Sequence, residues 1–68
     1  MNNTNKNYCI SLEDMDFIGI KEGKVYEYSY EYNAEDLDTY YTVYTNQHYD
    51  WVGSEDMFNK SFFTKDGF

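Results

Sequence analysis

Carboxylates are the side chains of this sequence that are best suited to chemistry. Thirteen Asp and Glu residues outnumber five lysines, arginine is absent, and no lysine occurs between Lys24 and Lys60. Two carboxylates can hydrolyse a glycosidic bond when they flank it in a cleft, and such a cleft needs roughly hundreds of Å³. A chain of 68 residues has little room for one beside its own core. We therefore expect no enzymatic activity.

Calcium binding is the second chemistry that carboxylates allow. Glu35, Asp36 and Asp38 lie close together and follow Asn33. The EF-hand pattern needs acids at alternate positions, then Gly and a distant Glu, and this spacing is absent. The sequence also lacks a Gly-rich phosphate loop, a CxxC pair and an HExxH motif. We expect no metal and no cofactor, and we interpret this acidic stretch as a solvated loop.

Cys9 and His48 are the remaining candidates for nucleophilic or general-base chemistry. A reactive Cys9 would need a neighbouring cation or His, and a single Cys among strand-forming residues is typical of a small buried side chain. His48 follows Asn46 and Gln47 in a segment typical of a solvated turn. The low cysteine content fits a reducing compartment. We expect a cytoplasmic protein, because there is neither a signal peptide nor an apolar run of about 20 residues.

Alternating residues indicate the strands that must position these side chains. Residues 24–32 form the clearest strand, with tyrosines on one face and mostly polar residues on the other. The first face carries Tyr26, Tyr28, Tyr30 and Tyr32, and the second carries Val25, Glu27, Ser29 and Glu31. A core this small cannot easily satisfy four tyrosine hydroxyls. One end of the Tyr row should therefore emerge at the surface.

The other elements follow from shorter patterns. Strands are expected at residues 8–12, 39–45, 49–53 and 61–63. Ser54 is typical of a helix N-cap, with a helical turn at residues 55–60. Residues 17–20 are apolar and should anchor the core, and residues 21–24 should form a tight turn around Gly23. This order predicts a mainly β fold, a small five-stranded antiparallel SH3-like barrel with one short helical turn before the last strand.

Three segments carry a resemblance: GIKEGKVYE at residues 19–27, YYTVY at 40–44 and WVGSEDMF at 51–58. They resemble small SH3-like barrel proteins of bacteriophages and mobile elements, over about residues 8–63. Core and turn positions carry this resemblance, so it implies a fold and transfers no functional residue. Some small acidic phage proteins block host nucleases or other DNA-binding proteins, so the resemblance also implies an inhibitor. We expect one domain at residues 8–68 after a disordered arm at residues 1–7.

The distribution of charge favours a phage-type inhibitor that occludes its target without chemistry. Glu27 and Glu31 lie about 13 Å apart along one strand face, close to four base-pair rises of duplex DNA. Such a DNA mimic would repel nucleic acid and bind a basic host or defence protein, such as a nuclease, a repair enzyme or a restriction or CRISPR-type effector. The expected partner-binding residues are Glu27, Tyr30, Glu31, Tyr32, Glu35, Asp36, Asp38, Tyr40, Tyr41 and Trp51. Acids and aromatics should meet at residues 31–41.

The alternative is a small protein-protein interaction module that uses a Tyr/Trp surface. Such a surface would dock a peptide, a host protein or a second copy of the chain as a homodimer. Its residues would be Tyr28, Tyr30, Tyr44 and Trp51, and the acids would then only provide solubility. Removing Tyr side chains should weaken such a module more, whereas neutralising acids should weaken the DNA mimic more.

Overall fold

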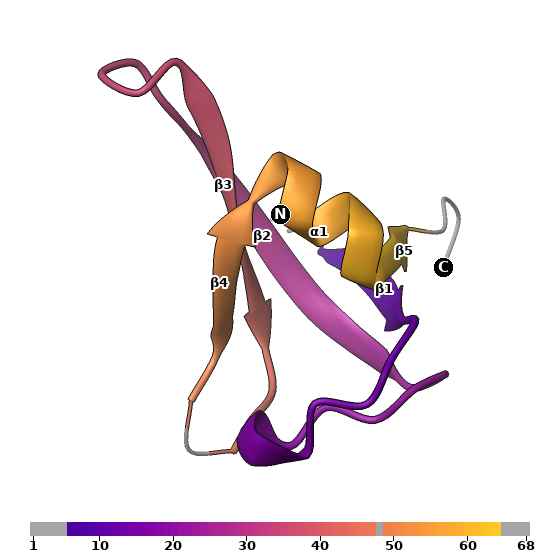
Figure 1. The fold of residues 1–68 in the computed structure, drawn as a ribbon. Helices are drawn as coiled ribbons and strands as arrows, with labels where there is room; N and C mark the ends of the chain where they lie inside the picture. Colours follow the sequence, from indigo (N-terminus) through magenta and orange to yellow (C-terminus); the bar gives the residue numbers. More distant parts are fainter. Residues whose placement is uncertain (1–5, 48, 65–68) are drawn as a thin grey trace, which may run out of the picture.

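Five antiparallel strands form one curled sheet, a half-barrel, in the computed structural model (Figure 1). The strands are β1 (Asn7–Ser11), β2 (Val25–Asn33), β3 (Asp38–Tyr44), β4 (Trp51–Ser54) and β5 (Phe62–Thr64), in the order β4-β3-β2-β1-β5. A 3-10 helix, η1 (Asp16–Ile18), precedes β2, and α1 (Glu55–Ser61) connects the edge strands β4 and β5. This confirms the predicted mainly β fold with five antiparallel strands and one short helix before the last strand.

The structure describes residues 6–47 and 49–64. Most of the expected N-terminal arm, the turn residue His48 and the end of the chain after Thr64 lie outside these residues. Within the described ranges, no helix combines the length and the apolar composition needed to cross a membrane.

The β2–β3 hairpin carries different side chains on its two faces. Directly opposed residues of an antiparallel pair share a face. On the concave side, which holds the core, Tyr28 lies opposite Val43 and Tyr30 lies opposite Tyr41. We call this side the inner face and the convex side the outer face. The outer face carries Glu27, Ser29 and Glu31 of β2 opposite Tyr44, Thr42 and Tyr40 of β3. The separation of acids from the Tyr row on β2 is therefore as predicted.

Aromatic rings between the inner face and α1 make up much of the core. Phe58 projects from α1, and its ring centroid lies 4.2 Å from that of Tyr41 with the planes inclined by only 14°. Trp51 meets Phe62 edge-on, with centroids 5.0 Å apart. Offset stacking and edge-to-face contacts are the arrangements that aromatic quadrupoles favour. These rings hold α1 against the sheet although the helix has only 7 residues.

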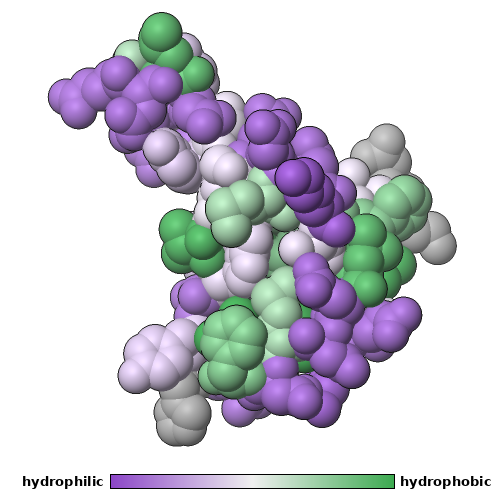
Figure 2. All heavy atoms as spheres, in the orientation of Figure 1, coloured by the Kyte–Doolittle hydropathy of each residue, from purple (hydrophilic) through white to green (hydrophobic). Residues whose placement is uncertain are grey.

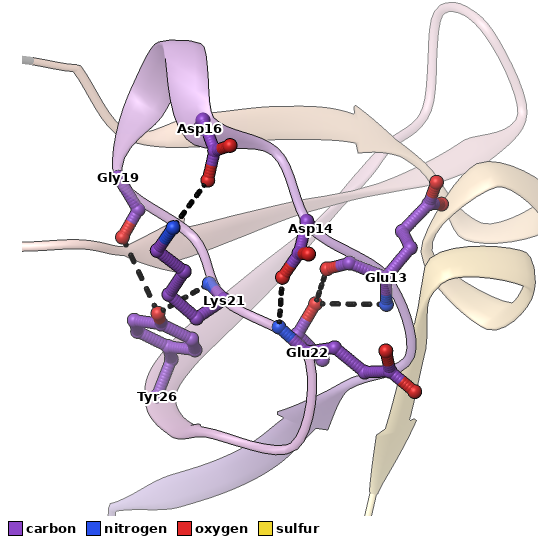
Figure 3. Close-up of polar contacts among 8 residues, drawn as sticks. Glu13, Asp14, Asp16, Gly19, Lys21, Glu22 and Tyr26 are labelled. Atoms are coloured by element: carbon purple, nitrogen blue, oxygen red, sulfur yellow. Dashed lines mark hydrogen bonds and ion pairs between the residues drawn. The ribbon is translucent and has the colours of Figure 1, made fainter.

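The Tyr row of β2 begins in the core and ends in solvent, as the sequence predicts. Tyr26 is buried, and its hydroxyl donates to the carbonyl of Gly19 at 3.3 Å and accepts from the Lys21 amide at 3.0 Å (Figure 3). Because its hydroxyl is satisfied, burying this ring carries little polar cost. Tyr30 and Tyr32, at the other end of the row, are 58% and 60% exposed.

Two local expectations are confirmed by the backbone. Gly23 has φ of 82°, which only a residue without Cβ adopts at little cost, and it lies in the predicted turn. The Ser54 side chain accepts a hydrogen bond from the Met57 amide at 3.5 Å. Ser54 therefore caps α1 and fixes where the helix begins.

Two expectations about the N-terminal part are corrected. Asn7 belongs to β1, where it pairs with Tyr28, and not to the arm predicted for residues 1–7. Residues 17–20 do not all anchor the core: Ile20 is fully buried, whereas Phe17 is 82% exposed. The 3-10 turn of η1 turns the Phe17 ring toward solvent. In β1 the inner face carries the small residue Cys9, which is buried as expected.

Candidate functional site

The outer part of the β2–β3 hairpin projects beyond the rest of the sheet (Figure 1). β1 pairs with β2 only as far as Tyr28, and β4 pairs with β3 only as far as Tyr40. β2 and β3 nevertheless continue to pair with each other up to Asn33 opposite Asp38. We call residues 29–40 the projecting hairpin. Among residues 6–47 and 49–64, no neighbouring strand flanks its end, and side chains on both of its faces are exposed there.

A side chain organises the loop that closes the projecting hairpin. The Asn33 Oδ1 atom accepts hydrogen bonds from the Glu35 amide at 2.9 Å and the Asp36 amide at 3.3 Å. Asn is favoured in turns because its short side chain reaches its own backbone in this way. Leu37 completes the turn with φ of 55°, in the left-handed region. These contacts fix the backbone that carries the carboxylates of Glu35 and Asp36.

Four carboxylates of the projecting hairpin have no lysine partner among the described residues. They belong to Glu31, Glu35, Asp36 and Asp38. The described ion pairs involve Glu27 and Asp16 instead. Within the described ranges, no group of three or more His, Cys, Asp or Glu side chains is arranged to hold a metal ion. The projecting hairpin therefore presents negative charge to solvent.

Tyr40 joins the acids on this surface. Its hydroxyl donates to Asp36 Oδ2 at 2.9 Å. This hydrogen bond and the charge of Asp36 raise the pKa of Tyr40, with a smaller contribution from Asp38. Tyr40 also lies opposite Glu31 on the outer face. Acids and aromatics thus meet within residues 31–41, where the sequence placed their junction.

A pocket of about 420 Å³ lies at this junction. It is lined by Glu31, Tyr32, Asn33, Ala34, Glu35 and Tyr40. Two carboxylates and two phenol rings in the wall of a pocket suit a cationic side chain, which they attract by charge and contact through ring faces. Figure 2 shows hydrophilic residues along the projecting hairpin and a hydrophobic cap at its end. Leu37, in the closing loop, is exposed, and no sequence pattern marked it as a site residue.

Several acids outside the projecting hairpin are used within the fold, and Figure 3 shows three of them in the loop before β2. Asp16 pairs with Lys21 at 2.6 Å, and Asp14 accepts from the Glu22 amide at 2.8 Å. The Glu13 carboxylate accepts from the Ser61 hydroxyl at 2.7 Å. These acids order loops, whereas the acids of the projecting hairpin hold only their own loop and remain open to a partner.

The structure brings seven of the ten predicted partner-binding residues together on the projecting hairpin and separates the other three. Tyr41 is half-buried at the base of the projecting hairpin, under Tyr30. Glu27 lies below it on the outer face, 3.9 Å from the Lys6 amine. Trp51 is only 9% exposed and packs in the core, so it does not contribute to a binding surface. Its place is a correction to the predicted set. The remaining members lie on the projecting hairpin: Tyr30, Glu31, Tyr32, Glu35, Asp36, Asp38 and Tyr40.

Cys9, the candidate nucleophile, is fully buried on the inner face. Burial raises the pKa of its thiol to about 12. The thiol therefore stays protonated at neutral pH, and a protonated thiol is a poor nucleophile. His48, the other candidate, lies outside the described residues.

The half-barrel of five antiparallel strands, with one helix before the last strand, agrees with the layout that the sequence suggested. The segments at residues 19–27, 40–44 and 51–58 lie in the part of the chain that forms β2, β3, β4 and α1. The projecting hairpin adds a feature that those segments do not specify. Comparisons of the chain with protein-family models, with curated proteins and with solved structures gave no match in any of the three.

Proposed function

We propose that this protein is a non-enzymatic, phage-type inhibitor of SH3-like fold that binds a basic host or defence protein through the projecting hairpin. The observation that carries the proposal is the set of carboxylates on the projecting hairpin that pair with no lysine among the described residues and lie beside exposed phenol rings. Glu31, Glu35 and Asp36 are exposed, and no described lysine pairs with them. A target that normally binds nucleic acid offers the complementary lysines and arginines.

The inhibitor acts by occupying a groove. A two-stranded β ribbon is narrow enough to enter the major groove of DNA, and a groove that admits a duplex is wide enough to admit such a ribbon. Glu27 and Glu31 follow each other along the outer face at a spacing of about 13 Å. This spacing is close to four base-pair rises of duplex DNA, with Glu27 at the base of the hairpin beside the Lys6 amine. The net charge of −8 steers a cationic target toward the hairpin.

The geometry supports a Tyr/Trp interaction module less well. Of its four residues, Trp51 is buried, and Tyr28 and Tyr44 are half-buried. The Tyr44 hydroxyl also makes a 2.7 Å hydrogen bond with the Ser29 hydroxyl. Only Tyr30 offers a largely exposed ring. A homodimer through the projecting hairpin would place like charges of two copies together, which costs free energy.

The test compares two double variants of equal net charge. Glu31→Gln with Glu35→Gln neutralises the pocket of the projecting hairpin, and Glu22→Gln with Asp56→Asn neutralises exposed acids away from it. The measurement is the affinity for purified basic DNA-binding proteins at low and high salt, with duplex DNA as a competitor. We expect the hairpin variant to bind more weakly and the control to bind as the unaltered protein does. Binding that ignores salt and survives the hairpin variant would contradict the proposal.

A further inference from the structure

A ladder of stacked rings runs from the core to the surface along the inner face. Phe58 stacks on Tyr41 at 4.2 Å, and Tyr41 stacks on Tyr30 at 5.4 Å with an interplanar angle of 29°. Tyr28 packs beside them, 5.8 Å from Tyr41. The ladder ends at Tyr30, whose ring is 58% exposed. One side of a ring that is already held in place by stacking is thus available to a partner, and ordering it costs little entropy.

A carboxylate lies beside this ladder. Glu55 is the first residue of α1, directly after Ser54, and Ser54 pairs with Tyr40, the neighbour of Tyr41. Burial raises the pKa of Tyr41, and the negative charge of Glu55 raises it further. Glu55 also precedes Phe58 by three residues, so the two side chains share one side of α1, and Phe58 is the residue that stacks on Tyr41. The Ser54 cap fixes the start of the helix and with it the position of Glu55.

An aromatic face beside a carboxylate matches the chemistry of arginine. A guanidinium is planar and stacks on a phenol ring while its N–H groups donate to a carboxylate. An ammonium group pairs with the carboxylate as a point charge but does not stack in this way. An anion is repelled by Glu55 and by the ring face alike. The arrangement thus favours arginine over lysine.

We propose that the exposed ring of Tyr30, backed by Tyr41, and the carboxylate of Glu55 form a binding site for an arginine side chain of the protein partner. This inference rests on the proposed function and adds the chemistry of one partner residue. The site shares no residue with the pocket at the end of the hairpin, which is lined by Glu31, Tyr32, Asn33, Ala34, Glu35 and Tyr40. A second copy of this chain cannot fill it, because the sequence contains no arginine: its five basic residues are Lys6, Lys21, Lys24, Lys60 and Lys65.

The experiment uses two probes, an arginine homopeptide and a lysine homopeptide of equal length. Their affinities are measured by titration at low salt, and the ring signals of Tyr30 are followed by NMR. A cation–π contact at an exposed site corresponds to roughly a 2- to 5-fold preference. We expect the arginine peptide to bind tighter by about that factor and to shift the ring signals of Tyr30 more.

Matched variants assign the preference to this site. Tyr30→Leu and Glu55→Gln should each bring the two affinities together, while Tyr30→Phe, which keeps a ring, should retain most of the preference. Phe17→Leu removes an exposed ring elsewhere and should leave the preference unchanged. Circular dichroism checks that each variant folds.

The results of the peptide titrations distinguish failure of the arginine site from failure of the proposed function. Equal affinities for the two peptides, or a preference that persists in Tyr30→Leu, overturn the arginine site and leave the acidic hairpin standing. Failure of both peptides to bind at low salt overturns the proposed function together with the arginine site.

Discussion

The Tyr40 hydroxyl donates a hydrogen bond to Asp36 Oδ2 at 2.9 Å, and this contact ties β3 to the loop that closes the projecting hairpin. It is an acid-aromatic contact within a surface that otherwise faces solvent. It engages one carboxylate oxygen of Asp36, a residue that is exposed. The contact also raises the pKa of Tyr40, which can be measured on this one phenol.

The first prediction concerns the ionisation of Tyr40. Because the hydrogen bond to Asp36 and its charge favour the protonated phenol, the pKa of Tyr40 lies above its ordinary value. The stabilisation that this phenol provides is present below the ordinary tyrosine pKa of about 10. It is lost as the pH rises through the higher folded value. Asp36→Asn should move the pKa of Tyr40 back toward 10, as followed by NMR of its ring. An unchanged titration in this variant would show that Asp36 is not the cause.

The second prediction concerns Cys9. Its pKa is raised to about 12 by burial, whereas the unfolded thiol ionises near about 8.5. The unfolded state therefore loses its proton first, and the free energy of unfolding should fall between about pH 8.5 and 12. In the same pH series, Cys9→Ala should lack the part of this fall in the free energy of unfolding that Cys9 causes. The other titrating groups contribute equally to both proteins. A thiol reagent should react with native Cys9 far more slowly than with the urea-unfolded chain. Two parallel stability profiles would contradict the assignment.

The third prediction concerns the ring that holds α1 to the sheet. Phe58→Leu should lower the free energy of unfolding by about 1–2 kcal/mol, because it removes buried area and the stacking against Tyr41. Phe63→Leu changes an exposed ring and should stay within about 0.5 kcal/mol. Urea unfolding followed by circular dichroism measures both. Equal effects of the two substitutions would mean that Phe58 is not the main contact of the helix.

The fourth prediction concerns the close approach of Trp51 to the backbone of β4. A Cβ atom at Gly53 would lie 2.6 Å from a ring carbon of Trp51, closer than carbon atoms pack. Gly53→Ala should therefore force the buried indole to move and cost about 1–3 kcal/mol, as overpacked cores do. Shifted indole fluorescence and a lower urea midpoint are the expected readouts. Unaltered fluorescence and stability would show that the ring can move without cost.

Local chemistry explains what the sequence predicted well. The alternation in residues 24–32 determines which side chains of β2 share a face, whatever lies next to the strand. Ser54 acts through its side chain on the nearby helix backbone, and Gly23 acts through its own backbone conformation, so the cap and the turn could be recognised without knowledge of the fold. The exposure of one end of the Tyr row could be predicted because a small core cannot easily supply hydrogen-bond partners for several phenol hydroxyls.

Pairing between strands from distant parts of the chain explains the features that could not be predicted from the sequence. Alternation in β1 groups Tyr8 with Ile10, yet it does not tell which face the sheet buries, and the small residues Cys9 and Ser11 fill the inner face. Trp51 lies inward because it pairs with Val43, a buried residue of β3. The length of the projecting hairpin depends on where β1 and β4 stop, and these strands come from distant parts of the chain.

The salt dependence of binding to a basic DNA-binding protein tests the central claim most directly. The affinity should fall steeply with salt concentration for the unaltered protein, because it depends on counterions released from charged surfaces. The slope should decrease in Glu31→Gln with Glu35→Gln and stay the same in Glu22→Gln with Asp56→Asn. Equal slopes and equal affinities for all three proteins would contradict the account, since the acids of the projecting hairpin would then contribute no more than any others.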